Sequence, residues 1–294
     1  MHSTSVECIR LQLCGGQCAL EKPSRKRRLF AYLKDDILTD MAKKRLIIGN
    51  WKMFIEDPLE AHAFALGLRR RVRSLKGLEV WLAPSHPLIP DVAKVLESSP
   101  VRVGAQVISA YEDGHRTGDV SAATAKKVGA TFTLVGHSER RIMGDTQEVV
   151  HAQLERAIEA GLNPVLCIGE RERENDGEHF GLLEAQLTSA LKNIPTNSLK
   201  KLIVAYEPVW AIGKHAIDAM KPAEIQEMVI FIRKVMAETL DRAAALKVPV
   251  LYGAAVEPEN AASLIHEGGV NGLLVGHASA QLDQFLEIIK ATQN

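Results

Sequence analysis

A closed barrel of eight parallel strands, each followed by a helix, is the fold class that this sequence of 294 residues predicts. From residue 44 onward, eight short runs of β-branched and apolar residues alternate with longer amphipathic stretches. Strands separated by crossover helices pair in parallel, and eight such units in about 250 residues are the span of a closed (β/α)8 barrel. An open doubly wound sheet is the alternative. No G-x-G-x-x-G follows the first run, so the usual dinucleotide-binding signal of that fold is absent.

The eight expected strands are justified one by one by their apolar content. The first four carry Leu-Ile-Ile, Val-Trp-Leu, Val-Arg-Val and Phe-Thr-Leu-Val, and lie at 46–49, 79–83, 101–104 and 132–136. The other four carry Val-Leu-Cys-Ile, Leu-Ile-Val-Ala, Val-Pro-Val-Leu-Tyr and Leu-Leu-Val, and lie at 164–168, 202–205, 248–252 and 272–276. Each run is followed by a helical pattern or by a loop leading to one, as a barrel requires.

Residues 1–43 read differently from the barrel domain expected at 44–294. They hold Cys8, Cys14 and Cys18 and a basic run at 25–28, without a clear period. A metal clip made by these cysteines and His2 would match no standard zinc spacing, and the acidic residues in this segment argue against a transit peptide. We therefore expect a dispensable, irregular N-terminal extension.

The charge balance excludes several classes of partner. Lys plus Arg and Asp plus Glu both total 36, so no global field attracts nucleic acid or an anionic membrane. No window holds the roughly 18 consecutive apolar residues of a membrane span. The four cysteines do not form the even framework of a secreted disulfide protein. Together these observations predict a soluble, cytoplasmic chain with no nucleic acid or membrane partner.

Unusual sequence motifs with polar residues lie at the ends of four of the expected strands. They are Gly-Asn-Trp-Lys-Met at 49–53, Gly-His-Ser-Glu-Arg-Arg at 136–141, Cys-Ile-Gly-Glu at 167–170 and Ala-Tyr-Glu-Pro-Val-Trp-Ala-Ile-Gly at 205–213. In a (β/α)8 barrel, reacting groups project from these C-terminal strand ends. An amide, an ammonium, an imidazole and a carboxylate around one mouth suit proton abstraction next to a carbonyl. Taken alone, each of these residues could equally be a solvent-exposed side chain or a helix cap. We expect such ordinary roles for His62, His151 and His266, which lie in amphipathic helical stretches.

These four motifs, in this order, resemble those of the triosephosphate isomerase family, and the resemblance covers residues 44–294. The resemblance implies that Glu207 is the base that moves a proton between two carbons of a sugar phosphate. It implies that His137 polarises the carbonyl as a neutral imidazole, because the positive end of the helix that it begins disfavours a charged ring. Lys52 would hold the substrate oxyanion and phosphate, and Asn50 would donate to the substrate oxygen.

The resemblance also implies supporting roles and excludes a cofactor. Glu139 would be the counter-ion of Lys52, and Ser138 would support the site from the same motif. The stretch 208–213 is similar to the first part of the family's lid, which keeps water from the enediolate. Neither a metal nor any other cofactor is implied.

At the phosphate end the sequence departs from the family. The resemblance places Gly213, Ala255, Gly276 and His277 around the phosphate, but 252–255 reads Tyr-Gly-Ala-Ala instead of Tyr-Gly-Gly-Ser. Gly-His at 276–277 replaces Gly-Gly at a helix start suited to an anion. If that position required a positive φ, His277 would be strained; otherwise its imidazole adds a donor or narrows the pocket. The second half of the lid, at 214–218, lacks the family's second glycine.

The stretch 110–119 resembles the family's dimer loop, in which Thr117 would reach the neighbouring subunit's site. A homodimer follows by analogy, with His115 and Arg116 altering the interface. The alternative is a solvent-exposed loop, although ten residues without an interface are long for a loop in a compact barrel.

Three functions remain open at this point. The first is interconversion of dihydroxyacetone phosphate and glyceraldehyde 3-phosphate, a step of glycolysis and gluconeogenesis. The second is isomerisation of a longer, four-carbon ketose phosphate, favoured by the altered phosphate end. The third is a non-catalytic phosphate-binding scaffold. Such a scaffold is expected to have lost the base or the electrophile, whereas His137 and Glu207 both lie in complete motifs.

Overall fold

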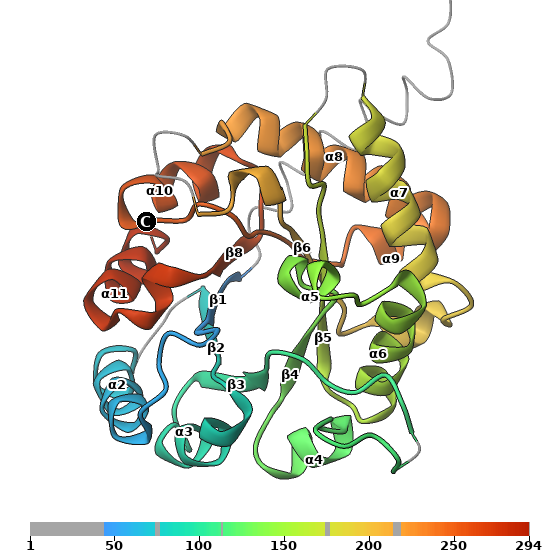
Figure 1. The fold of residues 1–294 in the computed structure, drawn as a ribbon. Coiled ribbons are helices and arrows are strands. Elements are labelled where there is room, and N and C mark those ends of the chain that lie inside the picture. Colours follow the sequence, from blue (N-terminus) through green and yellow to red (C-terminus); the bar gives the residue numbers. More distant parts are fainter. Residues whose placement is uncertain (1–43, 74–76, 113, 174–176, 214–218, 294) are drawn as a thin grey trace, which may run out of the picture.

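Eight parallel strands close into a barrel in sequence order, with β1 paired to both β2 and β8 (Figure 1). This computed structural model describes residues 44–73, 77–112, 114–173, 177–213 and 219–293. The expected extension, residues 1–43, lies outside the described residues, as do its three cysteines. The predicted fold class is thus confirmed, and the doubly wound alternative is wrong because the sheet has no open edge.

Each expected strand lies within two residues of an observed one. The strands are β1 Arg45–Asn50, β2 Leu78–Ala83, β3 Val101–Ala105, β4 Phe132–Val135, β5 Asn163–Ile168, β6 Ile203–Tyr206, β7 Val250–Tyr252 and β8 Gly272–Val275. The largest difference is at β7, which begins after Pro249. Proline has no N–H to give to a ladder, so pairing on that side starts one residue later.

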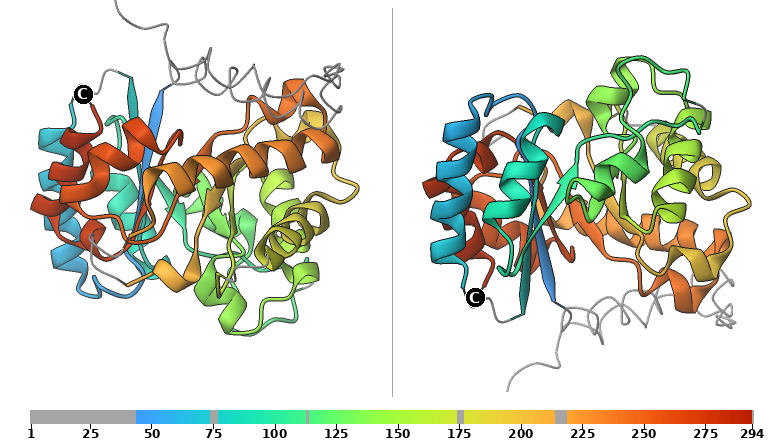
Figure 2. Two further views of the ribbon diagram at one scale, coloured as in Figure 1. Left: turned by 90° about the horizontal axis from the view of Figure 1, so that it is seen from above. Right: turned by 90° about the horizontal axis from the view of Figure 1, so that it is seen from below.

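Helices surround the barrel, and the first and last of those described, α2 and α11, pack against each other (Figure 2). Side chains that accept a main-chain N–H begin several of them: Asp57 caps α2, Ser121 caps α4 and Thr146 caps α6. None of the described helices combines the length and the apolar character needed to cross a membrane. The helices are α2 Pro58–Arg71, α3 Ile89–Val95, α4 Ala122–Lys127, α5 Ser138–Ile142, α6 Gln147–Glu159, α7 Glu178–Leu191, α8 Pro222–Thr239, α9 Arg242–Ala245, α10 Pro258–Glu267 and α11 Leu282–Ala291.

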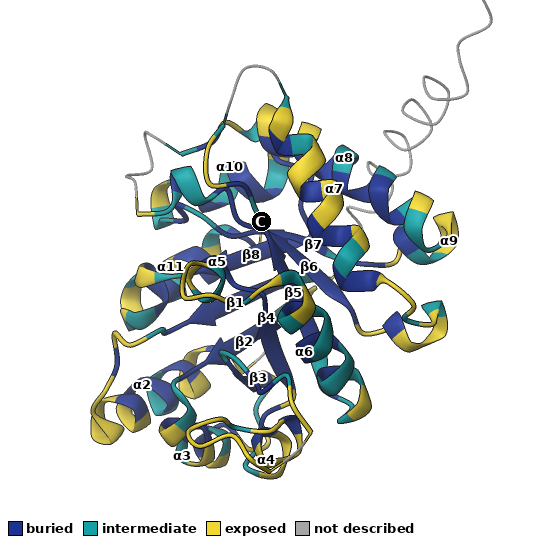
Figure 3. Ribbon diagram, turned by 45° about the vertical axis from the view of Figure 1, so that its right-hand side comes forward, coloured by how far each residue is buried: buried dark blue, intermediate teal, exposed yellow. Residues whose placement is uncertain are grey.

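Alternating side chains of the strands build two cores. Leu46 and Ile48 of β1 point to the same face and join the cluster inside the barrel, where the tilted rings of Trp81 and Phe132 have centroids 4.8 Å apart. Ile47, between them, faces outward into the layer that joins strands to helices. The strands are accordingly buried along both faces, while exposed residues gather on the outer sides of the helices (Figure 3).

Two glycines allow the strand ends to approach each other at the mouth. A Cβ atom on Gly169 would lie 1.8 Å from the carbonyl oxygen of Glu207, so any side chain there would push the end of β6 away from β5. Gly136 has a φ of 69°, in the left-handed region that favours glycine, and turns the chain from β4 into α5. Both glycines therefore determine where the side chains that follow β4 and β6 lie.

Candidate active site

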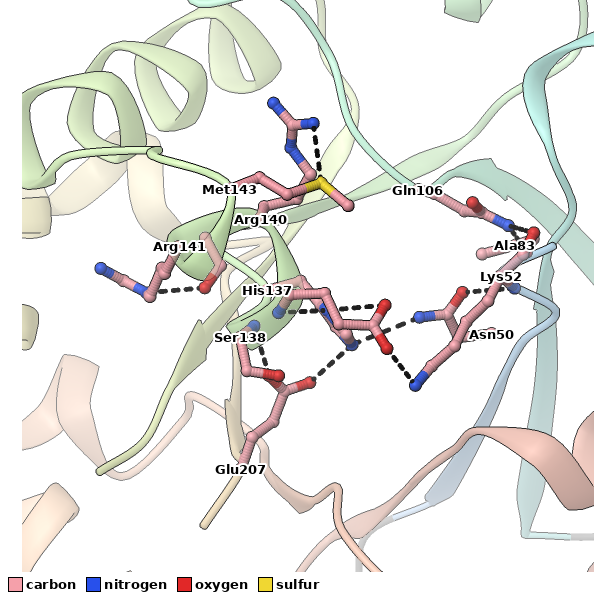
Figure 4. Close-up of polar contacts among 12 residues, drawn as sticks. Asn50, Lys52, Ala83, Gln106, His137, Ser138, Arg140, Arg141, Met143 and Glu207 are labelled. Carbon is pink, nitrogen blue, oxygen red and sulfur yellow. Dashed lines mark hydrogen bonds and ion pairs between the residues drawn. The ribbon is translucent and has the colours of Figure 1, made fainter. Parts of the chain in front are cut away.

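The barrel brings the four expected reacting groups to one mouth. Asn50 is the last residue of β1 and Lys52 follows two positions later; His137 follows β4, and Glu207 directly follows β6. Figure 4 shows His137 lying between Glu207 on one side and Asn50 on the other. The side chains of Asn50, His137 and Glu207 come from strands that are far apart in sequence, and all three are buried.

The carboxylate of Glu207 is held in one orientation. Its Oε2 atom accepts the main-chain N–H of Ser138 at 3.0 Å, and its Oε1 atom lies 3.3 Å from Nε2 of His137. The residue is only 2% exposed, so water competes little for either oxygen. A desolvated carboxylate with a fixed free lone pair is suited to act as a general base.

The hydrogen bonds of His137 determine its tautomer. Its Nδ1 atom accepts the main-chain N–H of Glu139 at 3.3 Å, in the manner of a helix cap for α5. A nitrogen that accepts cannot carry the proton, so the proton of the neutral ring lies on Nε2. Nε2 faces Glu207 and the cavity, and can donate to an oxygen bound there.

Asn50 and Lys52 form the opposite side of the mouth. The Oδ1 atom of Asn50 accepts the N–H of Lys52 at 3.0 Å, which leaves Nδ2 as a donor 3.4 Å from Nε2 of His137. Lys52 has a φ of 48°, a left-handed conformation that costs a non-glycine residue about 1–3 kcal/mol. The side chain of Gln106 donates to the carbonyl oxygens of Lys52 and Ala83, at 2.8 and 3.0 Å, and holds this turn.

The ammonium of Lys52 is paired with a carboxylate. Its Nζ atom donates to Oε1 of Glu139 at 2.6 Å, and the two side chains are 21% and 47% exposed. Because Glu139 also follows His137 in α5, one short segment orients both the imidazole and the ammonium. The contact keeps the cation at the mouth of the barrel, where both side chains remain partly exposed.

A buried carboxylate connects the strands to the start of the expected lid. Oε1 of Glu170 accepts from the hydroxyl of Tyr206 and the indole of Trp210, both at 2.9 Å, and from Arg173 at 3.0 Å. Burial raises the pKa of Tyr206, and the neighbouring Glu170 charge raises it further, so the hydroxyl remains a donor. The stretch 208–213 is thereby anchored at Trp210; residues 214–218 lie outside the described residues.

Cys167 and Arg141 lie behind the base. Burial raises the pKa of the Cys167 thiol well above its ordinary value, and the Glu207 carboxylate raises it further. Burial lowers the pKa of Arg141, while the charges near it act in the opposite direction. Arg141 donates to the carbonyl of Gly136 at 2.7 Å and to that of Cys167 at 3.2 Å, which ties β4 to β5 at the mouth.

A cavity of about 150 Å³ opens beside these groups. This is small against the roughly 300–1,000 Å³ of a site for drug-sized ligands, so the cavity suits a molecule of a few carbon atoms. The residues expected at the phosphate end line the same cavity as the reacting groups. Its lining includes Asn50, Lys52, His137, Glu207, Gly213, Ala255, Gly276 and His277.

The backbone at His277 is not strained. The non-glycine residues described with positive φ are Lys52, Ser98 and Asn193, so His277 has an ordinary conformation and begins a four-residue 3-10 helix. The expectation of strain therefore does not apply. Its exposed ring packs edge to face on Phe54, with ring centroids 5.0 Å apart.

Thr117 lies away from this cavity. It is exposed in the loop that follows β3 and lines none of the site.

Two residues to which the sequence assigned no role contribute to the site. Gln106 supports the turn at Lys52, and Glu170 anchors Trp210. The available signal was a polar residue one position after β3 and two positions after β5.

Together these groups can perform one kind of chemistry well. A buried carboxylate, an imidazole and an ammonium face one small cavity, as proton transfer next to a carbonyl requires. Among the residues that the structure describes, no three His, Cys, Asp or Glu side chains gather as metal ligands.

Comparison with known proteins identifies the family of this chain. The family model described as "Triosephosphate isomerase" matches residues 45–292. Relatives named triosephosphate isomerase include one from Carboxydothermus hydrogenoformans, 35% identical over 85% of this chain and 99% of the relative. Others come from Thermus thermophilus, 37% identical over 84% and 98%, and Dechloromonas aromatica, 38% identical over 85% and 99%. The chain therefore belongs to the triosephosphate isomerase family.

Proposed function

We propose that this chain interconverts dihydroxyacetone phosphate and glyceraldehyde 3-phosphate through an enediolate. The observation that carries the proposal is the pair formed by Glu207 and His137, whose Oε1 and Nε2 atoms lie 3.3 Å apart and face the same small cavity. A base and an electrophile at this separation can reach a carbon-bound proton and the adjacent carbonyl oxygen of one substrate. Membership of the family supports the same reaction.

The geometry suggests how each group acts. Glu207 takes the proton from the hydroxylated carbon of the ketose, and the electron pair of that bond forms the enediolate. His137 donates its Nε2 proton to the former carbonyl oxygen and recovers a proton from the neighbouring hydroxyl. Glu207 then returns its proton to the other carbon, which yields the aldose, while Lys52 and Asn50 stabilise the developing oxyanion.

Supporting groups keep this arrangement fixed. Glu139 orients the Lys52 ammonium, and the main-chain N–H of Ser138 orients the base. The stretch 208–213, anchored through Trp210 to Glu170, acts as the first part of a lid that excludes water from the enediolate. The phosphate lies at the end of the cavity lined by Gly213, Ala255, Gly276 and His277.

We assign the catalytic domain to residues 44–294 and treat residues 1–43 as dispensable. All eight strands and every residue of the proposed site lie within residues 44–294. The loop that holds Thr117, exposed at 111–112 and 114–119, supports a homodimer in which Thr117 approaches the partner's site. The free, buried thiol of Cys167 fits a reducing compartment such as the cytoplasm.

A coupled assay tests this function. The full chain and a chain that starts at Lys44 are supplied with glyceraldehyde 3-phosphate, with dihydroxyacetone phosphate and with a four-carbon ketose phosphate. We expect both chains to turn over the triose phosphates much faster than the tetrose. A Lys52→Met variant purified in the same way measures background from the host's own isomerase. Turnover of the tetrose alone, or of neither, would overturn the proposal.

A further inference from the structure

The two walls of the cavity differ in what they offer an anion. The wall after β7 consists of residues 253–257, and its first four side chains, in Gly-Ala-Ala-Val, have no hydrogen-bond donor. The fifth, Glu257, carries a carboxylate, which repels a phosphate. Side-chain attraction for a phosphate must therefore come from the opposite wall, which is built from the loops after β1 and β8.

On that opposite wall, Lys52 is the first cation. Its Nζ atom already donates to Glu139 at 2.6 Å, so part of its charge is compensated. A Cβ atom on Gly276 would lie 3.8 Å from this Nζ, which shows that the ammonium lies against the start of the loop after β8. A phosphate that meets Lys52 there also meets the next residue, His277.

The position of His277 is fixed from below by buried hydrogen bonds. The indole of Trp51 donates to the carbonyl of Ser279 at 3.1 Å, and both residues are fully buried. The hydroxyl of Ser279 in turn donates to the carbonyl of Gly276 at 2.7 Å. These bonds join the loop after β1 to the loop after β8 across the barrel seam.

The ring of His277 is fixed from the side. Phe54 lies three residues after Trp51 and donates its main-chain N–H to the Trp51 carbonyl at 2.9 Å. Its ring meets that of His277 at 81°, with centroids 5.0 Å apart. An edge-to-face contact of this kind favours one ring orientation, and His277 is among the residues that line the cavity.

We propose that the imidazole N–H of His277 binds the phosphate of the substrate, and that this residue, oriented by Phe54, determines substrate affinity in this protein. The inference rests on the proposed function for the identity of the sugar phosphate. It does not rest on it for anion binding, since a preorganised donor beside Lys52 binds free inorganic phosphate as well.

Two substitutions separate the donor from the ring. His277→Phe keeps an aromatic ring against Phe54 and removes the N–H, whereas His277→Gln keeps an N–H donor and removes the ring. Calorimetry with inorganic phosphate and the KM for glyceraldehyde 3-phosphate are measured for both. We expect His277→Phe to weaken phosphate binding and raise KM by about tenfold, since a lost hydrogen bond to a charged group has an effect of this size. His277→Gln is expected to stay within about threefold of the unmodified chain.

A matched histidine and a second wall complete the test. His62, an exposed histidine on α2 paired with Asp91, is changed to alanine and is expected to leave both quantities unchanged. Ala255→Ser introduced into the His277→Phe variant places a hydroxyl on the opposite wall and should recover part of the lost affinity.

The two proposals fail in different ways. If the unmodified chain turns over triose phosphates but His277→Phe binds phosphate and substrate normally, the role of His277 is wrong and the function stands. If turnover is absent while His277→Phe still loses phosphate affinity, the function is wrong and the role of His277 in anion binding stands.

Discussion

Gln106 holds the strained backbone of Lys52. Its side-chain amide, directly after β3, donates to the carbonyl of Lys52 at 2.8 Å and to that of Ala83 at 3.0 Å. The φ of 48° at Lys52 is therefore maintained by a residue on a different strand. A conformation that costs about 1–3 kcal/mol persists only where its surroundings impose it.

Replacing Gln106 by leucine is predicted to slow the enzyme more than it destabilises it. The volume is nearly retained, but two carbonyl oxygens lose their donor and the turn at Lys52 relaxes. We expect kcat/KM to fall by about tenfold and the free energy of unfolding by about 1–2 kcal/mol. Steady-state kinetics and urea unfolding measure the two effects.

Ile288→Val is the control for that variant. Ile288 is fully buried in α11 and distant from the mouth, and its truncation costs about 0.5–1.5 kcal/mol. It should lose stability without losing activity. Equal losses of activity in both variants would mean that Gln106 acts through stability alone.

Glu139→Gln is predicted to weaken the hold on the Lys52 ammonium. The amide still accepts a hydrogen bond from Nζ but no longer carries the charge that keeps the cation in place. We expect a fall in kcat of about tenfold with little change in stability, because both side chains are partly exposed. Kinetics and thermal unfolding check this, and an unchanged kcat would remove Glu139 from the proposed machinery.

Trp210→Phe is predicted to disturb the start of the lid. The variant keeps an aromatic ring but removes the indole N–H that donates to Glu170 at 2.9 Å. A hydrogen bond to a charged group contributes about 1.5–3 kcal/mol, and we expect a destabilisation at the lower end because Tyr206 and Arg173 still donate. Urea unfolding gives the loss; no loss would show that the bond is not formed in solution.

The Cys167 thiol makes stability depend on alkaline pH. Burial raises its pKa in the folded state, whereas an unfolded thiol has a pKa of about 8.5. Between these two values the folded chain keeps a proton that the unfolded chain loses, so the free energy of unfolding falls as pH rises. The expected slope is about 1.4 kcal/mol per pH unit for this group, and the stabilisation is complete below about pH 8.5.

Urea unfolding at pH 7, 9 and 10 tests that dependence. Cys167→Ala removes the titrating group and should show a shallower decline than the unmodified chain between pH 9 and 10. Tyr206, whose pKa is also raised by burial, contributes at higher pH in both proteins. Parallel declines would show that Cys167 titrates normally in the folded state.

The strands could be predicted from sequence because burial on both faces leaves a clear signal. Runs such as Leu-Ile-Ile in β1 have apolar residues on the inner and the outer face, so their type and order follow from composition alone. Their ends differ by one or two residues, as at β7, where Pro249 delays pairing. The motifs that follow β1, β4 and β6 then located the mouth, since parallel strands all end on the same side.

Contacts between distant loops could not be predicted. The bridge from Gln106 to Lys52 joins residues 54 positions apart, and nothing in the sequence near either one specifies it. The conformation at His277 was likewise open, because a φ value depends on how the loop after β8 packs on Trp51. Sequence identifies the chemical groups of this site, whereas tertiary packing determines which of them touch.

Proton transfer by Glu207 is the central claim, and isotope incorporation tests it most directly. Dihydroxyacetone phosphate is converted in D2O by the unmodified chain and by Glu207→Gln, and NMR follows deuterium on the carbon atoms of product and recovered substrate. We expect the unmodified chain to introduce carbon-bound deuterium during turnover, because the proton held on the carboxylate exchanges with solvent. Glu207→Gln should remain folded and introduce none. Carbon-bound deuterium and turnover at undiminished rates in Glu207→Gln would contradict the claim.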